Sequence, residues 1–346
     1  VDVTPSLYFI DNEVLGTASN PITFEAALTL DRAIPLNKGW TWISLPLASQ
    51  NQGSSNALMS QLNSTNGDLV KSQTQFDQFD QNTNWIGSIS SNGGYQNIKT
   101  YKVRKAQIDT LHLIGSRIHP DSSFAQINLL PGYNWIGFLS TKNLPIGVAL
   151  GNYAAHDGDL IKSQYEFAYY DSVSTSWLGS LTNLKPGQGY IFKTDYAGSF
   201  KYPLAAFLRT QVEEEALPEP YFDFYPEQYA KNMSMMIQSR FCHNNASGKE
   251  VLLGAFDANG QLKGYTRAVF NEEFKDWRYY LTVHGDQVQP LNLRWFVNET
   301  GELIEANYAF DFAEDQVLGS ARTPVYIQAA ESYFCMESSQ EEVNGW

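Results

Sequence analysis

The chain contains little charge, and positive charge least of all. Charged residues make up 17% of its 346 positions, and 23 Lys and Arg against 37 Asp and Glu give a net charge of −14. Counterion release from phosphates needs a cluster of cations, and no strong candidate element carries one. We therefore expect neither nucleic acid nor an anionic membrane surface as a partner. A run of about 18 apolar residues is also missing, so we expect no membrane insertion.

Recognisable catalytic motifs are missing as well. The sequence has no nucleophile elbow, P-loop, dinucleotide fingerprint or His-Glu-x-x-His pair, and its five histidines are scattered. We therefore expect a protein that is not an enzyme and carries no cofactor. Calcium is the alternative, on Asp157-Gly158-Asp159 or on Asp77 with Asp80, although neither stretch forms an EF-hand loop and Asp-Gly is first a turn dipeptide.

Cysteine is scarce too. The chain has two, Cys242 and Cys335, both in its last third. An even count predicts one disulfide in an exported protein, whereas in an intracellular protein the same residues would be two buried free thiols. The bond would restrict the unfolded chain and add roughly 2–4 kcal/mol to the free energy of unfolding.

What the sequence does contain favours strands over helices. Hydrophobic residues make up 43% of the chain and aromatic residues 14%, with 20 Tyr, 20 Phe and 8 Trp. Aromatic residues mixed with Thr, Ser, Asn and Gly are typical of strands joined by tight turns. The composition predicts a mainly β protein, and the length suits two or three domains.

Three motifs occur twice, in the same order and at nearly constant spacing. The first copies are Gly39-Trp40-Thr41-Trp42-Ile43-Ser44, Gly67-Asp68-Leu69-Val70-Lys71-Ser72-Gln73 and Trp85-Ile86-Gly87-Ser88-Ile89. The second copies are Gly132-Tyr133-Asn134-Trp135-Ile136-Gly137, Gly158-Asp159-Leu160-Ile161-Lys162-Ser163-Gln164 and Trp177-Leu178-Gly179-Ser180-Leu181. The offsets are 93, 91 and 92 residues, counted from Trp42 to Trp135, Asp68 to Asp159 and Trp85 to Trp177. We infer two tandem β-rich repeats, each with one short helix.

The recurring aromatic residues admit two interpretations. Recurrence at equivalent repeat positions, beside Ile or Leu for the four Trp, predicts that they form the shared core of each repeat, and the alternative is an exposed platform on which sugars stack. The residues concerned are Trp42, Trp85 and Tyr101 in the first repeat and Trp135, Trp177 and Tyr190 in the second.

Lys71 and Lys162 also recur, within apolar strands. The ordinary interpretation is a lysine on a strand face whose amine reaches water. The alternatives are a buried partner such as a carboxylate, or an isopeptide cross-link.

After Tyr202-Pro203 the composition changes. An acidic stretch with Glu213-Glu214-Glu215 and Pro218-Glu219-Pro220 predicts a linker, and six strand-like segments follow it. Those segments are Asn232–Ser239, Glu250–Phe256, Gly264–Phe270, Arg278–His284, Leu291–Val297 and Ala306–Phe312. Six or seven short strands with turn residues between them predict an antiparallel, Ig-like β-sandwich.

The predicted organisation follows from these boundaries. Residues 1–36 are lead-in strands or the end of a preceding domain, 37–120 the first repeat, 121–205 the second repeat, 206–223 the linker, 224–330 the sandwich and 331–346 a tail leading to a further domain. The chain starts at Val1 without a signal-like segment and stops at Asn344-Gly345-Trp346, so we expect a piece of a longer protein.

The order Gly-x-x-Trp-Ile, Gly-Asp-x-Ile-Lys-Ser-Gln, Trp-x-Gly-Ser-Leu and Pro-Gly-x-Gly-Tyr resembles a repeat of very large secreted surface proteins of Bacteroidota. The resemblance covers roughly residues 37–203 and includes a linking strand at Gly115-Ser116-Arg117-Ile118-His119-Pro120. The third region is similar to an accessory sandwich of the same proteins, through Gly254-Ala255-Phe256, Gly264, Tyr280-Leu281-Thr282-Val283-His284-Gly285, Thr300-Gly301 and Leu318-Gly319-Ser320. It implies export by the type IX secretion system and a place at the cell surface.

We therefore expect a non-catalytic structural or adhesive segment of a very large cell-surface or filament-forming extracellular protein. The alternative is a carbohydrate-binding region attached to a secreted polysaccharide-degrading enzyme. The expected partners are other chains of the same protein, with a homo-oligomer among the possibilities, or glycans and proteins of the cell surface.

Overall fold

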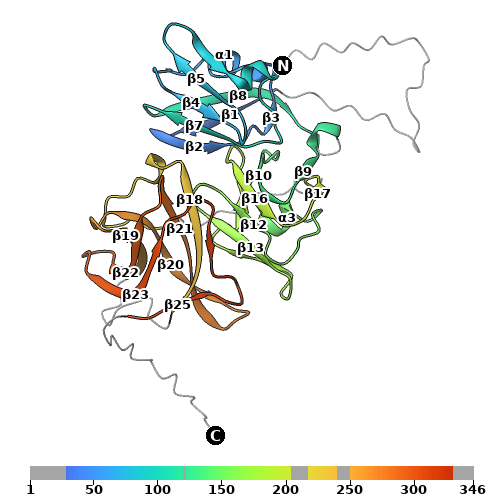
Figure 1. Cartoon of the computed structure of the whole chain (residues 1–346). Coiled ribbons are helices and arrows are strands. Elements are labelled where there is room, and N and C mark those ends of the chain that lie inside the picture. The colour runs from blue at the N-terminus through green and yellow to red at the C-terminus, as the bar shows by residue number, and fades with distance from the viewer. Residues whose placement is uncertain (1–28, 120–121, 204–216, 240–249, 330–346) are drawn as a thin grey trace, which may run out of the picture.

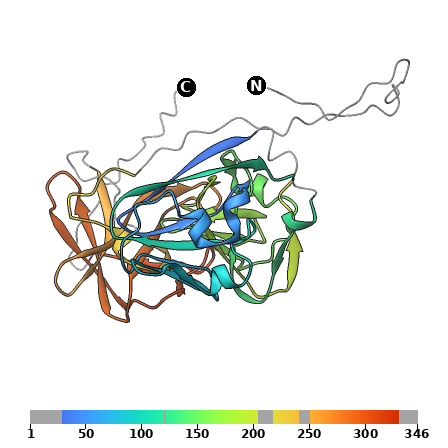
Figure 2. The same cartoon turned by 90° about the horizontal axis from the view of Figure 1, so that it is seen from above.

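The computed structural model describes residues 29–119, 122–203, 217–239 and 250–329. Within these ranges the chain is mainly β, as predicted, with three α-helices of four residues each. Figure 1 shows the first repeat in blue and teal at the top, the second repeat in green, and the third region in yellow to red. Seen from above in Figure 2, the first repeat lies across both of the others.

Each repeat is built on a five-stranded antiparallel sheet. The order in the first repeat is β2 (Gly39–Ile43), β7 (Tyr101–Lys105), β4 (Leu69–Lys71), β5 (Phe76–Asp80) and β6 (Asn84–Gly87). The order in the second is β10 (Gly132–Ile136), β16 (Tyr190–Thr194), β12 (Leu160–Lys162), β13 (Phe167–Asp171) and β14 (Ser176–Gly179). The strands correspond one to one, which confirms the predicted pair of repeats.

Smaller sheets close the core of each repeat. In the first repeat β1 (Leu30–Leu36) pairs with β8 (Asp109–Arg117), which also pairs with β3 (Leu47–Ala48). The predicted lead-in strand β1 thus belongs to this repeat, because Ile34 and Leu36 are buried in its core. In the second repeat β9 (Ile127–Leu129) pairs with β17 (Gly198–Phe200), and β11 (Leu144–Pro145) pairs with β15 (Asn183–Leu184).

Two of the three short helices in the described residues lie in the first repeat and one in the second. α1 (Ser55–Leu58) follows the 3-10 turn η1 (Gln50–Gly53) and is capped by Ser54, whose hydroxyl accepts the N–H of Ala57 at 3.2 Å. α2 (Ser88–Ser91) follows β6, and the 3-10 turn η2 (Ser123–Ala125) precedes β9. α3 (Ile146–Ala149) begins directly after Pro145, which occupies its N-cap position.

The Gly-Asp pair of the repeated motif builds the turn before β4 and β12. Gly67 and Gly158 have φ of +90° and +91°, a backbone conformation that glycine adopts without a steric penalty. The buried carboxylate that follows accepts a backbone N–H three residues upstream, at 3.0 Å in Asp68 and 2.8 Å in Asp159. The motif therefore recurs because each repeat needs the same tight turn.

The third region is one continuous sheet that curls around its core. Its strands are β18 (Lys231–Ser239), β19 (Val251–Asp257), β20 (Leu262–Asn271), β21 (Asp276–Gly285), β22 (Pro290–Val297), β23 (Leu303–Asp311), β24 (Val317–Leu318) and β25 (Val325–Ile327). The order is β23-β22-β19-β20-β21-β18-β24, and β25 also pairs with β18. The ten-residue β20 joins the two halves of the sandwich, since its first part pairs with β19 and its last part with β21.

The predicted linker is partly packed. Residues 204–216 lie outside the described ranges, but Phe222 packs edge-on against Phe256 and Phe296, with ring centroids 5.2 and 5.4 Å apart. The segment then forms the 3-10 turn η4 (Pro226–Gln228) before β18. Cys242, Cys335 and the tail 331–346 also lie outside the described residues, so the disulfide stays a prediction.

Candidate functional site

The two repeats are held together by the glutamine that ends the Gly-Asp-x-x-Lys-Ser-Gln motif. Gln164 donates from Nε2 to the carbonyl oxygen of Trp40 at 3.0 Å and accepts the N–H of Trp42 on Oε1 at 3.0 Å. Gln73 does the same in the other direction, to the carbonyl of Tyr133 at 2.7 Å and from the N–H of Trp135 at 3.1 Å. Each side-chain amide thus hydrogen-bonds to an edge strand as a neighbouring strand would.

A second pair of contacts has the same reciprocity. Ile43, at the end of β2, bridges to Gln188 of the second repeat, and Ile136, at the end of β10, bridges to Lys99 of the first. The adjacent N–H groups of Ser44 and Gly137 donate to backbone carbonyls across the interface at 2.9 and 2.8 Å. Equivalent residues contact each other in both directions, so the repeats are related by a pseudo-two-fold arrangement, like an isologous dimer within one chain.

This arrangement covers two open sheet edges. β2 and β10 are the outermost strands of their sheets, and an unpaired edge presents free N–H and C=O groups to other chains. The hydrogen bonds of Gln164 are buried, and a buried hydrogen bond contributes about 1 kcal/mol net, whereas those of Gln73 are exposed to solvent. Gln73 and Gln164 therefore stabilise the junction and also protect these edges from mispairing.

The predicted core aromatics divide into two groups. Trp85, Tyr101 and Tyr190 are buried in their repeat cores, and the half-buried Trp177 packs against the core of the second repeat. Trp42 and Trp135 instead lie at the junction, on either side of the Lys102 amine. Lys102 Nζ is 3.8 Å from the centroid of the Trp42 ring and 4.6 Å from that of Trp135.

Trp42 lies at the junction and not in the core because side chains alternate between the two faces of a strand. Ile43 enters the core of the first repeat, so its neighbour Trp42 must lie on the opposite face of β2. That face is covered by the rest of the molecule, so Trp42 and Ile43 are both buried. The sequence therefore does not show which of the two points into the core.

Lysine amines gather at this junction although the chain is acidic. Lys102 is buried and donates to the carbonyl of Ala230 at 3.0 Å, and burial holds its pKa well below the usual range, with Lys162 and Lys71 adding to the effect. Lys71 is half-buried, and its Nζ lies 5.1 Å from the Trp40 ring centroid; burial lowers its pKa as well. Aromatic faces partly compensate cations that have left water.

Lys162 does not reach water as the ordinary interpretation of a strand-face lysine expects. It is buried, and its amine donates to Asp315 Oδ1 at 2.6 Å and to Asn232 Oδ1 at 2.7 Å, both in the third region. The expectation is wrong for this residue because the third region docks on the face of β12 that carries it.

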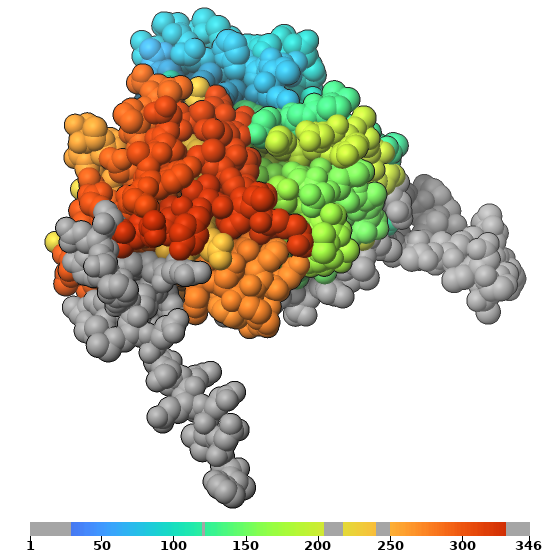
Figure 3. Space-filling view, turned by 60° about the horizontal axis from the view of Figure 1, so that its bottom comes forward, coloured from blue at the N-terminus to red at the C-terminus, as the bar shows by residue number. Residues whose placement is uncertain are grey.

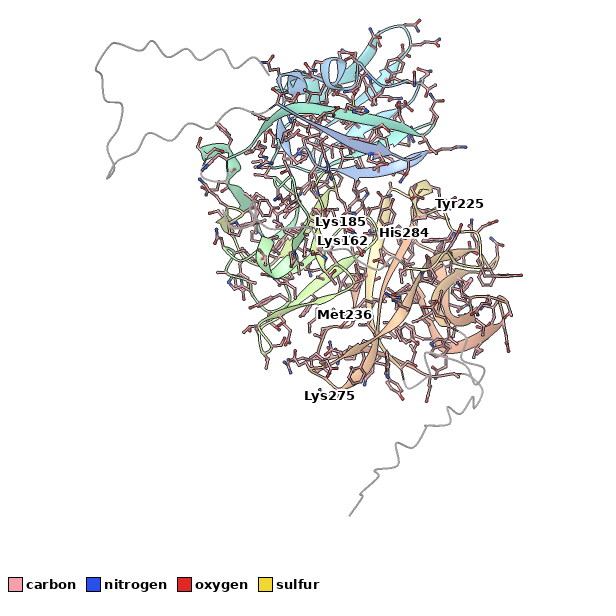
Figure 4. The ribbon with its side chains drawn as sticks, turned by 180° about the vertical axis from the view of Figure 1, so that it is seen from behind. Lys162, Lys185, Tyr225, Met236, Lys275 and His284 are labelled. Atoms are coloured by element: carbon pink, nitrogen blue, oxygen red, sulfur yellow. The ribbon has the colours of Figure 1, made fainter. Side chains whose placement is uncertain are left out.

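The third region packs on the second repeat through apolar and polar contacts together. Phe167 and Leu160 meet Met236 and Tyr280 in one buried cluster. Figure 4 shows Lys162, Met236 and His284 along this seam. In the space-filling view of Figure 3, the blue first repeat lies over the boundary between the green second repeat and the red third region.

Polar side chains fix the orientation at both ends of the seam. Arg322 makes two hydrogen bonds of 2.9 Å to the carboxylate of Asp171. His284 donates from Nε2 to the carbonyl of Gln164 at 2.8 Å, and burial lowers its pKa to about 4, so the ring is neutral. The equivalent face of the first repeat is more open, since Phe76 is 52% exposed where Phe167 is 0% exposed.

A groove of about 910 Å³ runs between the first repeat and η4. Tyr225 and Ile108 are 63% and 78% exposed and supply its apolar surface. Asn66, Arg104 and Gln228 line it with polar groups. An exposed aromatic ring beside amide and guanidinium groups is suited to a polar ligand with an apolar face, such as a sugar.

The acidic residues considered for calcium serve the fold. Asp77 is buried, accepts the Ile89 N–H at 2.8 Å and the Ser55 hydroxyl at 2.7 Å, and so fixes the start of α2. Asp159 belongs to the tight turn before β12. Among the described residues, no three His, Cys, Asp or Glu side chains are close enough together to hold a metal ion.

Comparison with known proteins adds no family. No protein-family model matches the chain, and no curated protein matches it. In the part of the chain that the structure describes, the helices are too short or too polar to cross a bilayer. The resemblance to Bacteroidota surface proteins accordingly stays a prediction from the repeated motifs.

The sequence marks some residues of the junction and not others. Gln73 and Gln164 are identical ends of a repeated motif, and their role could have been inferred from that recurrence. Lys102 has Ile191 at its place in the second repeat, and Asn232 and Asp315 stand in ordinary strand and turn contexts. Nothing in the sequence marks these three.

Proposed function

We propose that the chain is a non-catalytic structural or adhesive segment of a very large cell-surface or filament-forming protein, exported by type IX secretion. The observation that supports this function is the reciprocal glutamine contact between the repeats. Its four hydrogen bonds, together with the docked third region, join three β-rich units at one junction. Such a unit is suited to holding other domains at a fixed distance and orientation.

The junction uses its chemically distinctive side chains for assembly. Lys102 lies between two tryptophans, Asp171 binds Arg322, and His284 donates to a backbone carbonyl. Each of these groups connects units that are distant in sequence, as a structural role requires. The partners of the segment would then be other chains of the same protein or glycans and proteins of the cell surface.

Replacing both glutamines tests this role. In Gln73→Ala with Gln164→Ala the edge strands lose four hydrogen bonds, so we expect the repeats to separate more readily. Small-angle scattering should give a larger radius of gyration, and urea unfolding should split into more than one transition. The control is the exposed Gln78→Ala in β5. Unchanged scattering together with a single transition in the double variant would show that the two glutamines do not hold the repeats together, and would remove the observation on which the proposed function rests.

A second candidate function is carbohydrate binding, and the groove at Tyr225 favours it. Stacking of a sugar on an exposed ring contributes through apolar contact and adjacent hydrogen bonds. A glycan array probed with the intact chain should then show specific binding that Tyr225→Ala abolishes without changing the circular dichroism spectrum. Tyr196→Ala, at another exposed tyrosine, should bind normally. An array without specific binding would leave the purely structural function.

A further inference from the structure

At the seam between the second repeat and the third region, an amine, an amide and a carboxylate meet. Lys162 on β12 and Asn232 on β18 are 2% and 1% exposed. Lys162 Nζ lies 2.7 Å from Asn232 Oδ1 and 2.6 Å from Asp315 Oδ1. The amide carbon of Asn232 is one bond beyond the oxygen that the amine contacts.

Neighbouring groups hold all three side chains in place. Asn232 Nδ2 donates to the carbonyls of Ser163 and Gln164 at 3.2 and 2.9 Å, which fixes the plane of the amide. Asp315 has φ of +63°, its N–H donates to the Asn232 carbonyl at 3.0 Å, and its own carbonyl accepts the Tyr133 hydroxyl. The reacting groups are therefore positioned before any chemistry, which is the largest entropic requirement of a reaction between two side chains.

We propose that Lys162 and Asn232 form an isopeptide bond that joins the second repeat to the third region, with Asp315 as the proton carrier. The Lys162 ammonium first transfers a proton to the Asp315 carboxylate. The neutral amine then attacks Cγ of Asn232, forming the Nζ–Cγ bond. Asp315 protonates Nδ2, the Cγ–Nδ2 bond breaks, and ammonia is expelled. Asp315 then takes the second proton from Nζ and passes it to the ammonia, which leaves as ammonium.

The balance of this reaction needs no other reagent. One lysine ammonium and one asparagine amide give one secondary amide and one ammonium ion, without oxidation or reduction. The carboxylate of Asp315 is regenerated, and its side chain is 28% exposed, so this proton carrier reaches solvent.

The surroundings favour the neutral amine that the attack requires. Burial lowers the pKa of Lys162, while Asp315 acts in the opposite direction. Removing the charge from a buried lysine also relieves its desolvation. An amide bond at this point would turn a docked interface into a covalent one.

The chain contains its own matched control. Lys71 occupies the equivalent position in the first repeat, but its Nζ lies near the Trp40 and Trp135 rings, 5.1 and 5.9 Å from their centroids. Lys71→Arg therefore changes the same motif without touching the proposed bond.

Intact-mass spectrometry of the purified, reduced chain tests the proposal. The wild-type protein and Lys71→Arg should be lighter than the sequence mass by one ammonia, and Lys162→Arg and Asn232→Ala should have their full sequence masses. Asp315→Asn should lose the ammonia slowly or not at all. Peptide mapping of the wild type should recover one branched peptide that contains both Lys162 and Asn232.

Two results would overturn the proposal. One is a wild-type chain that keeps its full sequence mass after prolonged incubation at neutral pH. The other is a mass deficit that persists in Lys162→Arg, since an imide at an Asn-Gly pair such as Asn259-Gly260 also loses ammonia. The wild-type measurement requires no variant to fold, and the branched peptide separates the two sources of ammonia.

Discussion

Buried ionisable side chains at the three-way junction make its stability depend on pH. His284 donates to the carbonyl of Gln164 and is neutral, because burial lowers its pKa from 6.5 to about 4. The unfolded chain binds a proton as the pH falls below 6.5, whereas the folded chain does so near pH 4. Folding is therefore penalised progressively between these values, and the full loss is about 3 kcal/mol.

We expect His284→Gln to remove this pH dependence. The Gln amide keeps a donor toward the Gln164 carbonyl but takes up no proton, so at pH 7 the variant should lose about 1 kcal/mol at most. Urea unfolding at pH 7, 6 and 5 should show a weaker decline for the variant than for the wild type. The exposed His112→Gln serves as control, and equal declines in wild type and His284→Gln would show that the histidine is not responsible.

Lys102 shows how a single side chain can contact both repeats and the third region. Its amine lies between Trp42 of the first repeat and Trp135 of the second, and it donates to Ala230 of the third region. One side chain thus touches all three units. The two ring faces attract the ammonium form of this side chain, whereas burial lowers its pKa and so favours the neutral amine.

At the scale of elements, the loop before β16 depends on the small size of glycine. A Cβ at Gly189 would lie 2.6 Å from Thr100 Cγ2 and 2.9 Å from the carbonyl oxygen of Ile43. The Gly189 N–H donates to the Trp42 carbonyl at 3.0 Å, so the loop cannot move away without losing that contact. The Pro-Gly-x-Gly-Tyr motif therefore includes a residue needed for contact between the repeats.

Gly189→Ala should destabilise the chain by roughly 1–3 kcal/mol, the usual effect of forcing a methyl group into a packed site. Gly198→Ala is the matched control in the same repeat, because a Cβ there has no neighbour within 4 Å. Thermal and urea unfolding of both variants measure the difference. The same loss of stability in both would refute a close-packing role for Gly189.

At the scale of the whole molecule, local patterns predicted the elements and long-range contacts decided the site. The repeat offset predicted two equivalent β-rich repeats, and strand-like segments separated by turn residues predicted the strands from Asn232 to Phe312. These inferences succeed because strand pattern and turn chemistry are encoded locally.

The partners of the site residues could not be predicted in the same way. Lys162 meets residues that lie 70 and 153 positions away in the sequence, and no periodicity links them. Trp42 and Ile43 are both buried, so their sequence does not tell which one enters the core. Only the three-dimensional arrangement of the sheets assigns them to the junction or to the core.

The reciprocal contact between the repeats bears on how many repeats such a protein can contain. Each repeat offers its partner one glutamine and one of its two edge strands, β2 or β10, and in this pair both are used. A third copy added to the pair would find neither an uncovered equivalent edge nor an unused equivalent glutamine. Repeats of this kind would therefore occur in even numbers, because each one needs a partner to cover its edge strand. Duplication or loss during evolution would preserve the junction when it involves a pair rather than a single copy.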